Sequence, residues 1–228
     1  MRINNLCVAE RTLLAEVLKV NHFTRLGLVA LGAVVLLVVA PFSRAADINA
    51  IMAKCANCHG KDGSSTDPNI PIIGGMSSAY LEANLAAYKS KDRPCPQTEF
   101  KAGEKKGTKT DMCEAVKDLS GADIKQVADF LAKQTFVPAA QTIDAALAAK
   151  GQAIYKQSCE KCHSDNGKAA DDDAGILAGQ WIAYMKAQMA EVKSGARKTD
   201  KKNKMKQVVG ELDPAQNDAV LNYFASQK

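Results

Sequence analysis

Two five-residue segments of this chain combine cysteine and histidine at a spacing that can bind a porphyrin. Residues 55–59 read CANCH, and residues 159–163 read CEKCH. Two thiols three residues apart can form thioether bonds to the vinyl groups of one porphyrin, and the adjoining imidazole can then bind the iron. The sequence therefore predicts two covalently bound c-type haems with iron. The predicted attachment residues are Cys55, Cys58, Cys159 and Cys162, and the predicted first axial ligands are His59 and His163.

Two other interpretations of these cysteines are open. A Cys-x-x-Cys pair also serves thioredoxin-like redox proteins, but such a pair belongs in a βαβ setting, which this sequence lacks. A zinc site needs four ligands, which the two motifs could supply only by sharing their cysteines. Two motifs of one type, in register in an exported helical chain, favour haem over both alternatives.

The second axial ligand of each iron is predicted to be methionine. Downstream of residue 45 the only histidines are those of the two motifs, so bis-histidine ligation within the chain is excluded. The ligand should come from a loop well after CxxCH and before the last helix of each half. Met112 and Met205 lie there, with Met76 as the competing candidate in the first half. Histidine–methionine ligation raises the haem potential and fills both axial positions, which suits an electron carrier without catalytic residues of its own.

The proximal imidazoles also need a fixed orientation. A metal-binding histidine usually donates its other ring N–H to a carbonyl or carboxylate. For His59 we expect this acceptor near Pro71, and for His163 near Gly175.

Two cysteines downstream of residue 45 are not used by the motifs. Cys95 and Cys113 flank a lysine-rich stretch that has no counterpart in the second half of the chain. A disulfide between them would close a loop of about nineteen residues, worth about 3 kcal/mol in chain entropy. It would also tether Met112, the neighbour of Cys113. Two unpaired thiols are the alternative, which an oxidising compartment disfavours.

The elements that position these residues occur twice. An offset of 104 residues maps Cys55 onto Cys159, and the same offset maps Tyr80 onto Tyr184 without gaps. A gapless repeat of this length indicates two tandem domains of similar fold, not a solenoid. The predicted organisation is a signal peptide over residues 1–45, a first domain over 46–137, a linker over 138–143 and a second domain over 144–228.

Each half is predicted to be a small helical domain. Ser120 with Asp123, and Asp213 with Pro214, are typical of helix starts. Gly151, on a helical stripe before the second motif, is small enough for close helix packing. No segment alternates convincingly with period two, so we expect an all-α fold without a sheet.

The first 45 residues have the pattern of a secretory signal. Residues 26–40 are fifteen apolar or small residues that follow Arg11, Lys19 and Arg25. Small residues before position 46 predict cleavage after Ala45 and export to the periplasm. A membrane span needs about 20 apolar residues, so an uncleaved anchor is the weaker alternative, and we expect no membrane span after cleavage.

Composition excludes several function classes. Hydrophobic residues make up 46% and charged residues 24%, as in globular proteins. With 30 Lys and Arg against 25 Asp and Glu, the basic excess is too small for a dedicated nucleic-acid binder. No nucleotide-binding, zinc-protease or serine-hydrolase motif occurs. The basic segment 193–206 around Met205 is either a solvated loop or a docking patch for an acidic redox partner.

With these motifs placed, the chain resembles the dihaem class I cytochromes c of the c4 type, and among them most closely the cytochrome subunit of flavocytochrome c sulfide dehydrogenase. The segments that carry the resemblance are KQTFVPA (133–139), CEKCH (159–163), ILAGQW (176–181) and YFASQ (223–227). The resemblance covers essentially all of the chain after residue 45. The segment between Cys95 and Cys113 departs from the family pattern.

The resemblance implies two tandem class I cytochrome c domains, each built around one haem. It implies the iron ligands His59, Met112, His163 and Met205. It also implies an electron-transfer role in a sulfide dehydrogenase, with an FAD-containing subunit as donor and a soluble cytochrome or similar protein as acceptor. A free-standing dihaem carrier between a quinol-oxidising complex and a terminal oxidase is the alternative. A thiosulfate-oxidising dihaem enzyme with a cysteine ligand such as Cys113 is a third possibility.

Overall fold

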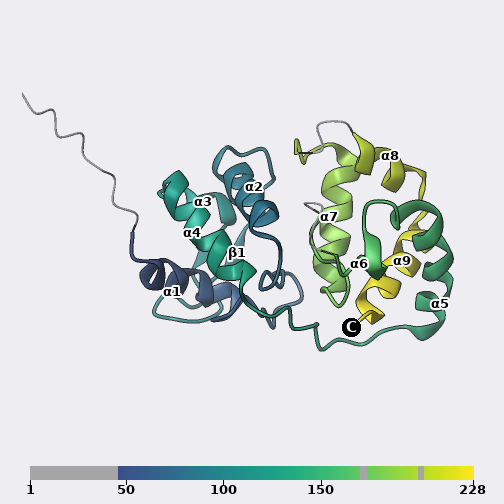
Figure 1. Cartoon of the computed structure of the whole chain (residues 1–228), viewed down its shortest axis with the longest axis horizontal. Helices are drawn as coiled ribbons and strands as arrows, with labels where there is room; N and C mark the ends of the chain where they lie inside the picture. Colours follow the sequence, from purple (N-terminus) through teal and green to yellow (C-terminus); the bar gives the residue numbers. More distant parts are fainter. Residues whose placement is uncertain (1–45, 170–173, 200–202) are drawn as a thin grey trace, which may run out of the picture. The chain divides into compact units, whose positions relative to one another are not determined.

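The structure, a computed structural model, describes residues 46–169, 174–199 and 203–228. The described residues are mostly helical, as predicted, and the helices form two successive groups (Figure 1). The first group contains α1 (Ile48–His59), α2 (Ser78–Lys89), α3 (Met112–Val116) and α4 (Gly121–Ala132). The second contains α5 (Ala145–Ile154), the π-helical η1 (Tyr155–Cys159), α6 (Ser164–Gly167), α7 (Ile182–Ser194), α8 (Lys204–Glu211) and α9 (Pro214–Ser226).

The predicted signal peptide over residues 1–45 and its cleavage site lie outside the described residues. Between the two groups of helices, residues 135–144 form neither helix nor strand. Ala139 N–H in this segment donates to the Gly179 carbonyl at 2.8 Å, and the Gln141 amide donates to the Gln180 carbonyl at 2.8 Å. The second half of this segment is therefore bound to the second group of helices, while Phe136, near its start, packs against the core of the first. The domain boundaries given above stay a prediction.

One part of the fold prediction was wrong, because a small sheet is present. Strands β1 (Thr98–Glu99) and β2 (Lys109–Thr110) pair antiparallel, with Thr98 opposite Thr110. Each strand has two residues, which is too short for an alternating pattern to be visible in the sequence. Both strands belong to the segment between Cys95 and Cys113, and they fold it into a hairpin.

The last helix of each domain begins at a reciprocal cap, as the sequence predicts. The Ser120 hydroxyl accepts from Asp123 N–H, and the Asp123 carboxylate accepts from Ser120 N–H at 2.8 Å. At α9, Asp213 and Gln216 form the same pair of bonds, with Pro214 as the first helical residue. Such caps satisfy N–H groups that have no partner inside the helix, and each contributes about 1 kcal/mol.

In the second domain α5 packs on α9 at a glycine, as predicted (Figure 1). A Cβ atom on Gly151 would lie 2.2 Å from the Ala219 carbonyl oxygen and 2.7 Å from Tyr223 Cβ. The approach of the two helices therefore depends on the missing side chain. Behind this contact lies a core that includes Tyr155, Val220 and Phe224.

The core of the first domain is built from α1, α2 and α4. Met52, Met76 and Leu131 are among its buried residues. Two residues of the second repeat, Ile176 and Ala178, belong to the same buried cluster. The loop before α7 therefore packs against the first domain as well as its own.

Candidate haem sites

The first motif lies in the last two turns of α1. His59 is the final helical residue, and Gly60, with φ 78°, ends the helix directly after it. Cys55 and Cys58 precede it on the same helix, and both thiols are free. The helix thus presents two thiols and one imidazole within a single short segment, which is the arrangement that the motif predicts.

His59 has the fixed orientation expected of a metal ligand. Its ring is buried, and Nδ1 donates to the Pro71 carbonyl oxygen at 3.0 Å, which confirms the predicted acceptor. Burial lowers the pKa of His59, although the bond to Pro71 acts in the opposite direction. The imidazole is therefore neutral at pH 7, with the proton on Nδ1. Its other nitrogen, Nε2, carries the lone pair that can bind iron.

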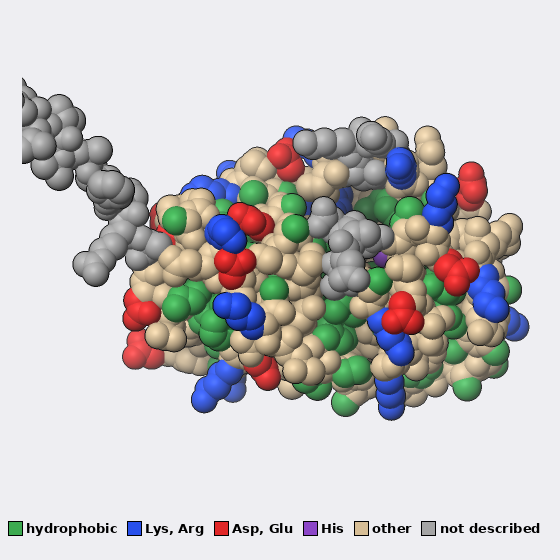
Figure 2. All heavy atoms as spheres, viewed as in Figure 1, with side chains coloured by type: hydrophobic (Ala, Val, Ile, Leu, Met, Phe, Trp, Pro, Cys, Tyr) green, Lys and Arg blue, Asp and Glu red, His purple; other side chains and the backbone are tan. Residues whose placement is uncertain are grey.

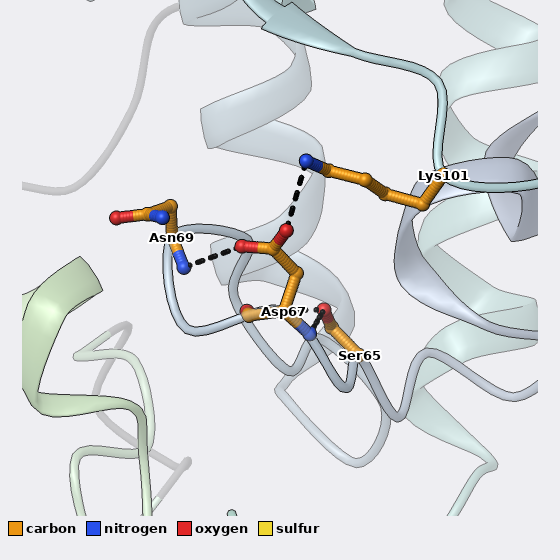
Figure 3. Close-up of polar contacts among 4 residues, drawn as sticks. All are labelled: Ser65, Asp67, Asn69 and Lys101. Atoms are coloured by element: carbon orange, nitrogen blue, oxygen red, sulfur yellow. Dashed lines mark hydrogen bonds and ion pairs between the residues drawn. The ribbon is translucent and has the colours of Figure 1, made fainter. Parts of the chain in front are cut away.

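The loop that supplies the Pro71 carbonyl is held by polar contacts of Asp67 (Figure 3). The Asp67 carboxylate accepts from Asn69 N–H at 2.8 Å and from Lys101 Nζ at 2.9 Å (Figure 3). Asp67 N–H donates to the Ser65 hydroxyl at 3.1 Å. Lys101 comes from the segment that the second domain lacks, so this segment braces the proximal loop of the first site.

The second motif differs from the first in local structure. Cys159 ends η1, and residues 160–162 form a turn, so only the first motif lies within a regular α-helix. The Tyr155 hydroxyl donates to the His163 carbonyl at 2.9 Å and accepts from Asn166 N–H at 2.9 Å, which fixes the turn. The predicted carbonyl acceptor for His163 near Gly175 stays a prediction.

The thiols of the second motif have different surroundings. Cys159 is buried and Cys162 is exposed, and both are free. Burial raises the pKa of the Cys159 thiol to about 11, with a smaller contribution from Cys162. In the chain before haem attachment, Cys159 is therefore a protonated, apolar thiol at pH 7, as expected of a side chain that is to face a porphyrin edge.

The two predicted methionine ligands lie in equivalent places, but not in loops. Met112 is the first residue of α3, whose cap is Asp111, and Met205 is the second residue of α8. Both side chains are partly exposed. Each is thus carried by a short helix ahead of the capped last helix of its domain. Their ligation of iron stays a prediction.

The competing methionine has a different environment. Met76 is only 3% exposed and packs in the first core beside Ile51 and Leu131. Its counterpart in the second repeat is Gln180, which is fully buried. The position of Met76 is therefore explained by packing in the core.

Cys95 and Cys113 form a disulfide, as predicted, with their Cα atoms 5.8 Å apart. The cross-link joins the start of the hairpin segment to the first turn of α3. The thiol of Cys113 is thus oxidised in the disulfide, and Cys113 directly follows Met112 in the sequence. The partly exposed Met112 is therefore carried by a turn that is covalently anchored.

The contacts between the two domains were not predicted from the sequence. The Gln180 amide accepts from Ile72 N–H at 3.0 Å and donates to the Ile72 carbonyl at 2.9 Å. The Trp181 indole N–H donates to the Ser65 carbonyl at 3.0 Å. Both residues lie in ILAGQW, the segment that carries the family resemblance, which was the one signal that could have pointed to them.

Acidic and basic side chains are interspersed over the face in Figure 2. None of the helices within the described residues has the length and apolar character to cross a bilayer. Part of the basic segment 193–206 lies outside the described residues.

The donor groups fit two covalently attached haems. Each repeat offers two free thiols three residues apart with a histidine next to the second, and the ring of His59 is oriented with one nitrogen available. The thiols that could form a shared zinc site belong to different helical domains, and no βαβ unit is present among the described residues. The donor set therefore matches the chemistry of haem attachment in both repeats.

Comparison with known proteins agrees with this result. The cytochrome c family matches residues 45–135 and again residues 148–228. Cytochrome c4 of Azotobacter vinelandii is 28% identical over 183 residues, which cover 75% of this chain and 83% of that protein. The thiosulfate dehydrogenase electron acceptor of Thiomonas intermedia is 27% identical over 186 residues, 77% of this chain and 79% of that protein.

Solved structures show the same relationship. The crystal structure of reduced recombinant cytochrome c4 from Pseudomonas stutzeri superposes with a TM-score of 0.65 and 28% identity, covering 81% of this chain and 100% of that one. The cytochrome c4 structure from Acidithiobacillus ferrooxidans gives 0.60 and 28%, covering 76% and 99%. Two CxxCH motifs, two helical domains and a family match to each of them give one conclusion. The chain belongs to the cytochrome c family, as a c4-type electron carrier with two tandem domains and two covalently bound c-type haems.

Proposed function

We propose that each domain holds its haem through the residues predicted above and that the protein carries electrons one at a time between a donor enzyme and an acceptor. The bound iron supplies one-electron chemistry. In the first domain the attachment residues are Cys55 and Cys58 and the axial ligands His59 and Met112; in the second they are Cys159 and Cys162, with His163 and Met205. The observation that carries this assignment, in the first domain, is the bond from His59 Nδ1 to the Pro71 carbonyl at 3.0 Å, and the repeat extends it to the second.

The role of the protein residues follows from that bond. A buried imidazole with a fixed tautomer keeps the same geometry in both oxidation states, since neither proton nor ring needs to move. An iron held by methionine as well as histidine would have no open position for a substrate. The pair thus favours rapid electron exchange over catalysis.

The proposed donor is an enzyme that oxidises a reduced sulfur compound in the periplasm. Two relatives are named as electron acceptors of thiosulfate dehydrogenase, from Thiomonas intermedia and from Stutzerimonas stutzeri. The FAD-containing sulfide dehydrogenase subunit expected from the resemblance is the other sulfur-oxidising donor. The same proposal includes export through a cleaved signal peptide and a soluble cytochrome or similar protein as acceptor.

The free-standing carrier between a quinol-oxidising complex and a terminal oxidase is the second candidate. The cytochrome c4 relatives fit this candidate, as the thiosulfate dehydrogenase electron acceptors fit the first, and both kinds of relative match about three quarters of the chain. Stopped-flow measurements compare the three candidate donors. The oxidised holoprotein is reduced by purified thiosulfate dehydrogenase, by the FAD-containing sulfide dehydrogenase subunit or by the quinol-oxidising complex. A sulfur-oxidising enzyme should reduce both haems at least about tenfold faster than the quinol-oxidising complex does; the reverse order would contradict the proposed donor.

The axial assignment is tested with Met112→Leu and Met205→Leu, each made in the holoprotein. Leucine keeps the volume and removes the sulfur. Each variant should lose half of the methionine-to-iron charge-transfer absorbance of the oxidised protein and lower the potential of one haem only. Met76→Leu is the matched control and should leave both signals unchanged. Loss of the band in Met76→Leu, with retention in Met112→Leu, would overturn the assignment in the first domain.

A further inference from the structure

The only two arginines downstream of residue 45 occupy equivalent positions in the two repeats. The 104-residue offset maps Arg93 onto Arg197, and all other basic side chains after residue 45, histidine aside, are lysines. The same offset maps Asn84 onto Gln188, and therefore an amide onto an amide. These four residues come together between the domains, and we refer to them as the arginine cluster.

The bonds of the arginine cluster are reciprocal. Arg93 donates to Asn84 Oδ1 of its own domain at 2.7 Å and to Gln188 Oε1 of the other domain. Arg197 donates to Gln188 Oε1 of its own domain at 3.4 Å and to Asn84 Oδ1 of the other at 3.1 Å. Each guanidinium thus joins the two domains, and each amide oxygen accepts from both guanidinium groups. This is the isologous pattern of a twofold interface, here within one chain.

The chemistry of the cluster requires arginine. A guanidinium offers several N–H donors in a planar fork and can reach two acceptors at once, whereas a lysine ammonium is a single point charge. Arg93 is 3% exposed, and its guanidinium lies 4.4 Å from the centre of the Tyr88 ring, where a cation–π contact adds to the attraction. A buried charge of this kind is tolerated only with good partners.

The surroundings of the cluster supply little negative charge. Glu191 is the carboxylate that interacts with both arginines, and burial raises its pKa although the two guanidinium groups act in the opposite direction. Burial also raises the pKa of Tyr88 and of Tyr184, which keeps both hydroxyl groups neutral. The amide oxygens of Asn84 and Gln188, together with the Tyr184 side chain, which hydrogen-bonds Arg93, therefore serve as uncharged partners of the guanidinium groups, and these partners come from both domains.

Two backbone bonds between the domains lie beside the cluster. Lys198 N–H, next to Arg197, donates to the Asp92 carbonyl, next to Arg93, at 2.8 Å. Tyr184 N–H donates to the Pro68 carbonyl at 3.0 Å, in the proximal loop of the first site. Both bonds can exist only while the domains keep this arrangement, so they report on it.

We propose that Arg93 and Arg197 are positioning residues, which hold the two haem domains in one arrangement and thereby set the rate of electron transfer from one haem to the other. The proposal rests on the dihaem electron-carrier function. Electron transfer between fixed centres falls steeply as their separation grows, so an interface that opens intermittently slows it. The arginine cluster joins the domains directly, in addition to the linker over residues 138–143.

The first test measures the interface itself. Hydrogen exchange of the holoprotein is followed in the peptides that contain Tyr184 N–H and Lys198 N–H, for Arg93→Lys, Arg197→Lys and the double variant. Lysine keeps the charge and removes the fork, so exchange at both sites should be at least about tenfold faster in the double variant. Lys198→Gln is the matched control: it removes an exposed charge beside Arg197, retains the reporting N–H, and should exchange at the rate of the parent chain.

A variant with the opposite expectation covers the case in which the lysine variants fold poorly. Gln188→Glu replaces a neutral acceptor by a carboxylate shared by both guanidinium groups, and charge-assisted bonds are about twice as strong. Exchange at Lys198 N–H should then be slower than in the parent protein. Faster or unchanged exchange in Gln188→Glu, with both haems attached, would overturn the proposal.

The second test measures the consequence. After injection of a single electron by pulse radiolysis, the rate of equilibration between the two haems should fall at least about threefold in the Arg93→Lys, Arg197→Lys double variant. Haem content and the methionine-to-iron band are recorded on the same samples. If both haems are present and ligated but exchange and equilibration match the parent, only the arginine proposal fails. If haems or ligation are missing from the parent protein, the proposed function fails instead.

Discussion

Asp67 is the side chain through which the proximal loop of the first site depends on charge. Its carboxylate binds Asn69 N–H and Lys101 Nζ, and the loop it holds ends at Pro71, the acceptor of the His59 bond. Burial alone would raise the pKa of Asp67, but these hydrogen bonds outweigh it and hold the pKa below the ordinary value. The ionised form is therefore the one that stabilises the fold.

The substitution Asp67→Asn tests this dependence. A carboxylate with a lowered pKa contributes stability above its unfolded-state pKa of about 4, and the contribution is lost as the pH falls through the folded-state pKa. Asp67→Asn should thus unfold at lower urea concentration than the parent holoprotein at pH 7, and the difference should shrink below pH 4. The exposed Asp118→Asn is the control. A difference that is the same at pH 3 and pH 7 would contradict the electrostatic explanation.

At the scale of elements, the contact of α5 with α9 depends on Gly151. An alanine there would place its Cβ atom 2.2 Å from the Ala219 carbonyl, so the helices must separate. Gly151→Ala should lower the free energy of unfolding by about 1–3 kcal/mol, the usual cost of overpacking. Chemical denaturation of the holoprotein measures it.

Gly210 provides the matched control for this change. It lies within α8, and a Cβ atom there would meet nothing within 4 Å. Gly210→Ala should therefore raise the free energy of unfolding by about 0.5–1 kcal/mol, because glycine is unfavourable inside a helix. Equal destabilisation by the two alanines would show that the contact is looser than described.

The hairpin segment is the element that distinguishes the first domain from the second. Its disulfide closes a loop between Cys95 and Cys113, and Lys101 within it binds Asp67. Replacing both cysteines by serine should cost about 3 kcal/mol of unfolding free energy, because the unfolded chain regains the entropy of the open loop. The Met112 band should weaken earlier in a thermal ramp than the Met205 band. If the two bands are lost in parallel, the disulfide does not stabilise the ligation of Met112.

For the molecule as a whole, Gln180 is a residue whose side chain forms two hydrogen bonds with the backbone of the other domain. It satisfies both polar groups of Ile72 and is fully buried. Gln180→Leu leaves these groups without partners and should cost about 1–3 kcal/mol. It should also raise hydrogen exchange in the peptide around Ile72. The exposed Gln207→Leu is the control and should change neither quantity.

Much of the fold and site could be predicted from the sequence, because the decisive signals are local. CxxCH spacing, helix caps at Ser120 and Asp213, and the close approach at Gly151 each involve a few neighbouring residues. The disulfide followed from counting cysteines in an exported chain. The ligand methionines were placed by comparing the repeats, and their location in short helices instead of loops was not foreseen.

What could not be predicted involves either very short elements or contacts between the repeats. Strands β1 and β2 contain two residues each, and the π-helical turn η1 leaves no periodic signature. The repeat describes each domain by itself, so the pairing of Gln180 with Ile72 was invisible to it. The two arginines at equivalent positions are, beside the ILAGQW segment, a second sign of an interface in the sequence, but spacing alone does not show that Arg93 and Arg197 lie together.

The central claim is that each CxxCH motif carries one covalently attached haem. Counting the haems and locating them on the chain tests this claim most directly. The intact mass of the purified, denatured holoprotein, followed by peptide mapping, should show two haems, one on the peptide with Cys55 and Cys58 and one on the peptide with Cys159 and Cys162. A variant with Cys55 and Cys58 both changed to serine should retain one haem, on the peptide with Cys159 and Cys162. A protein that loses its pigment on denaturation, or that carries fewer than two haems per chain, would contradict it.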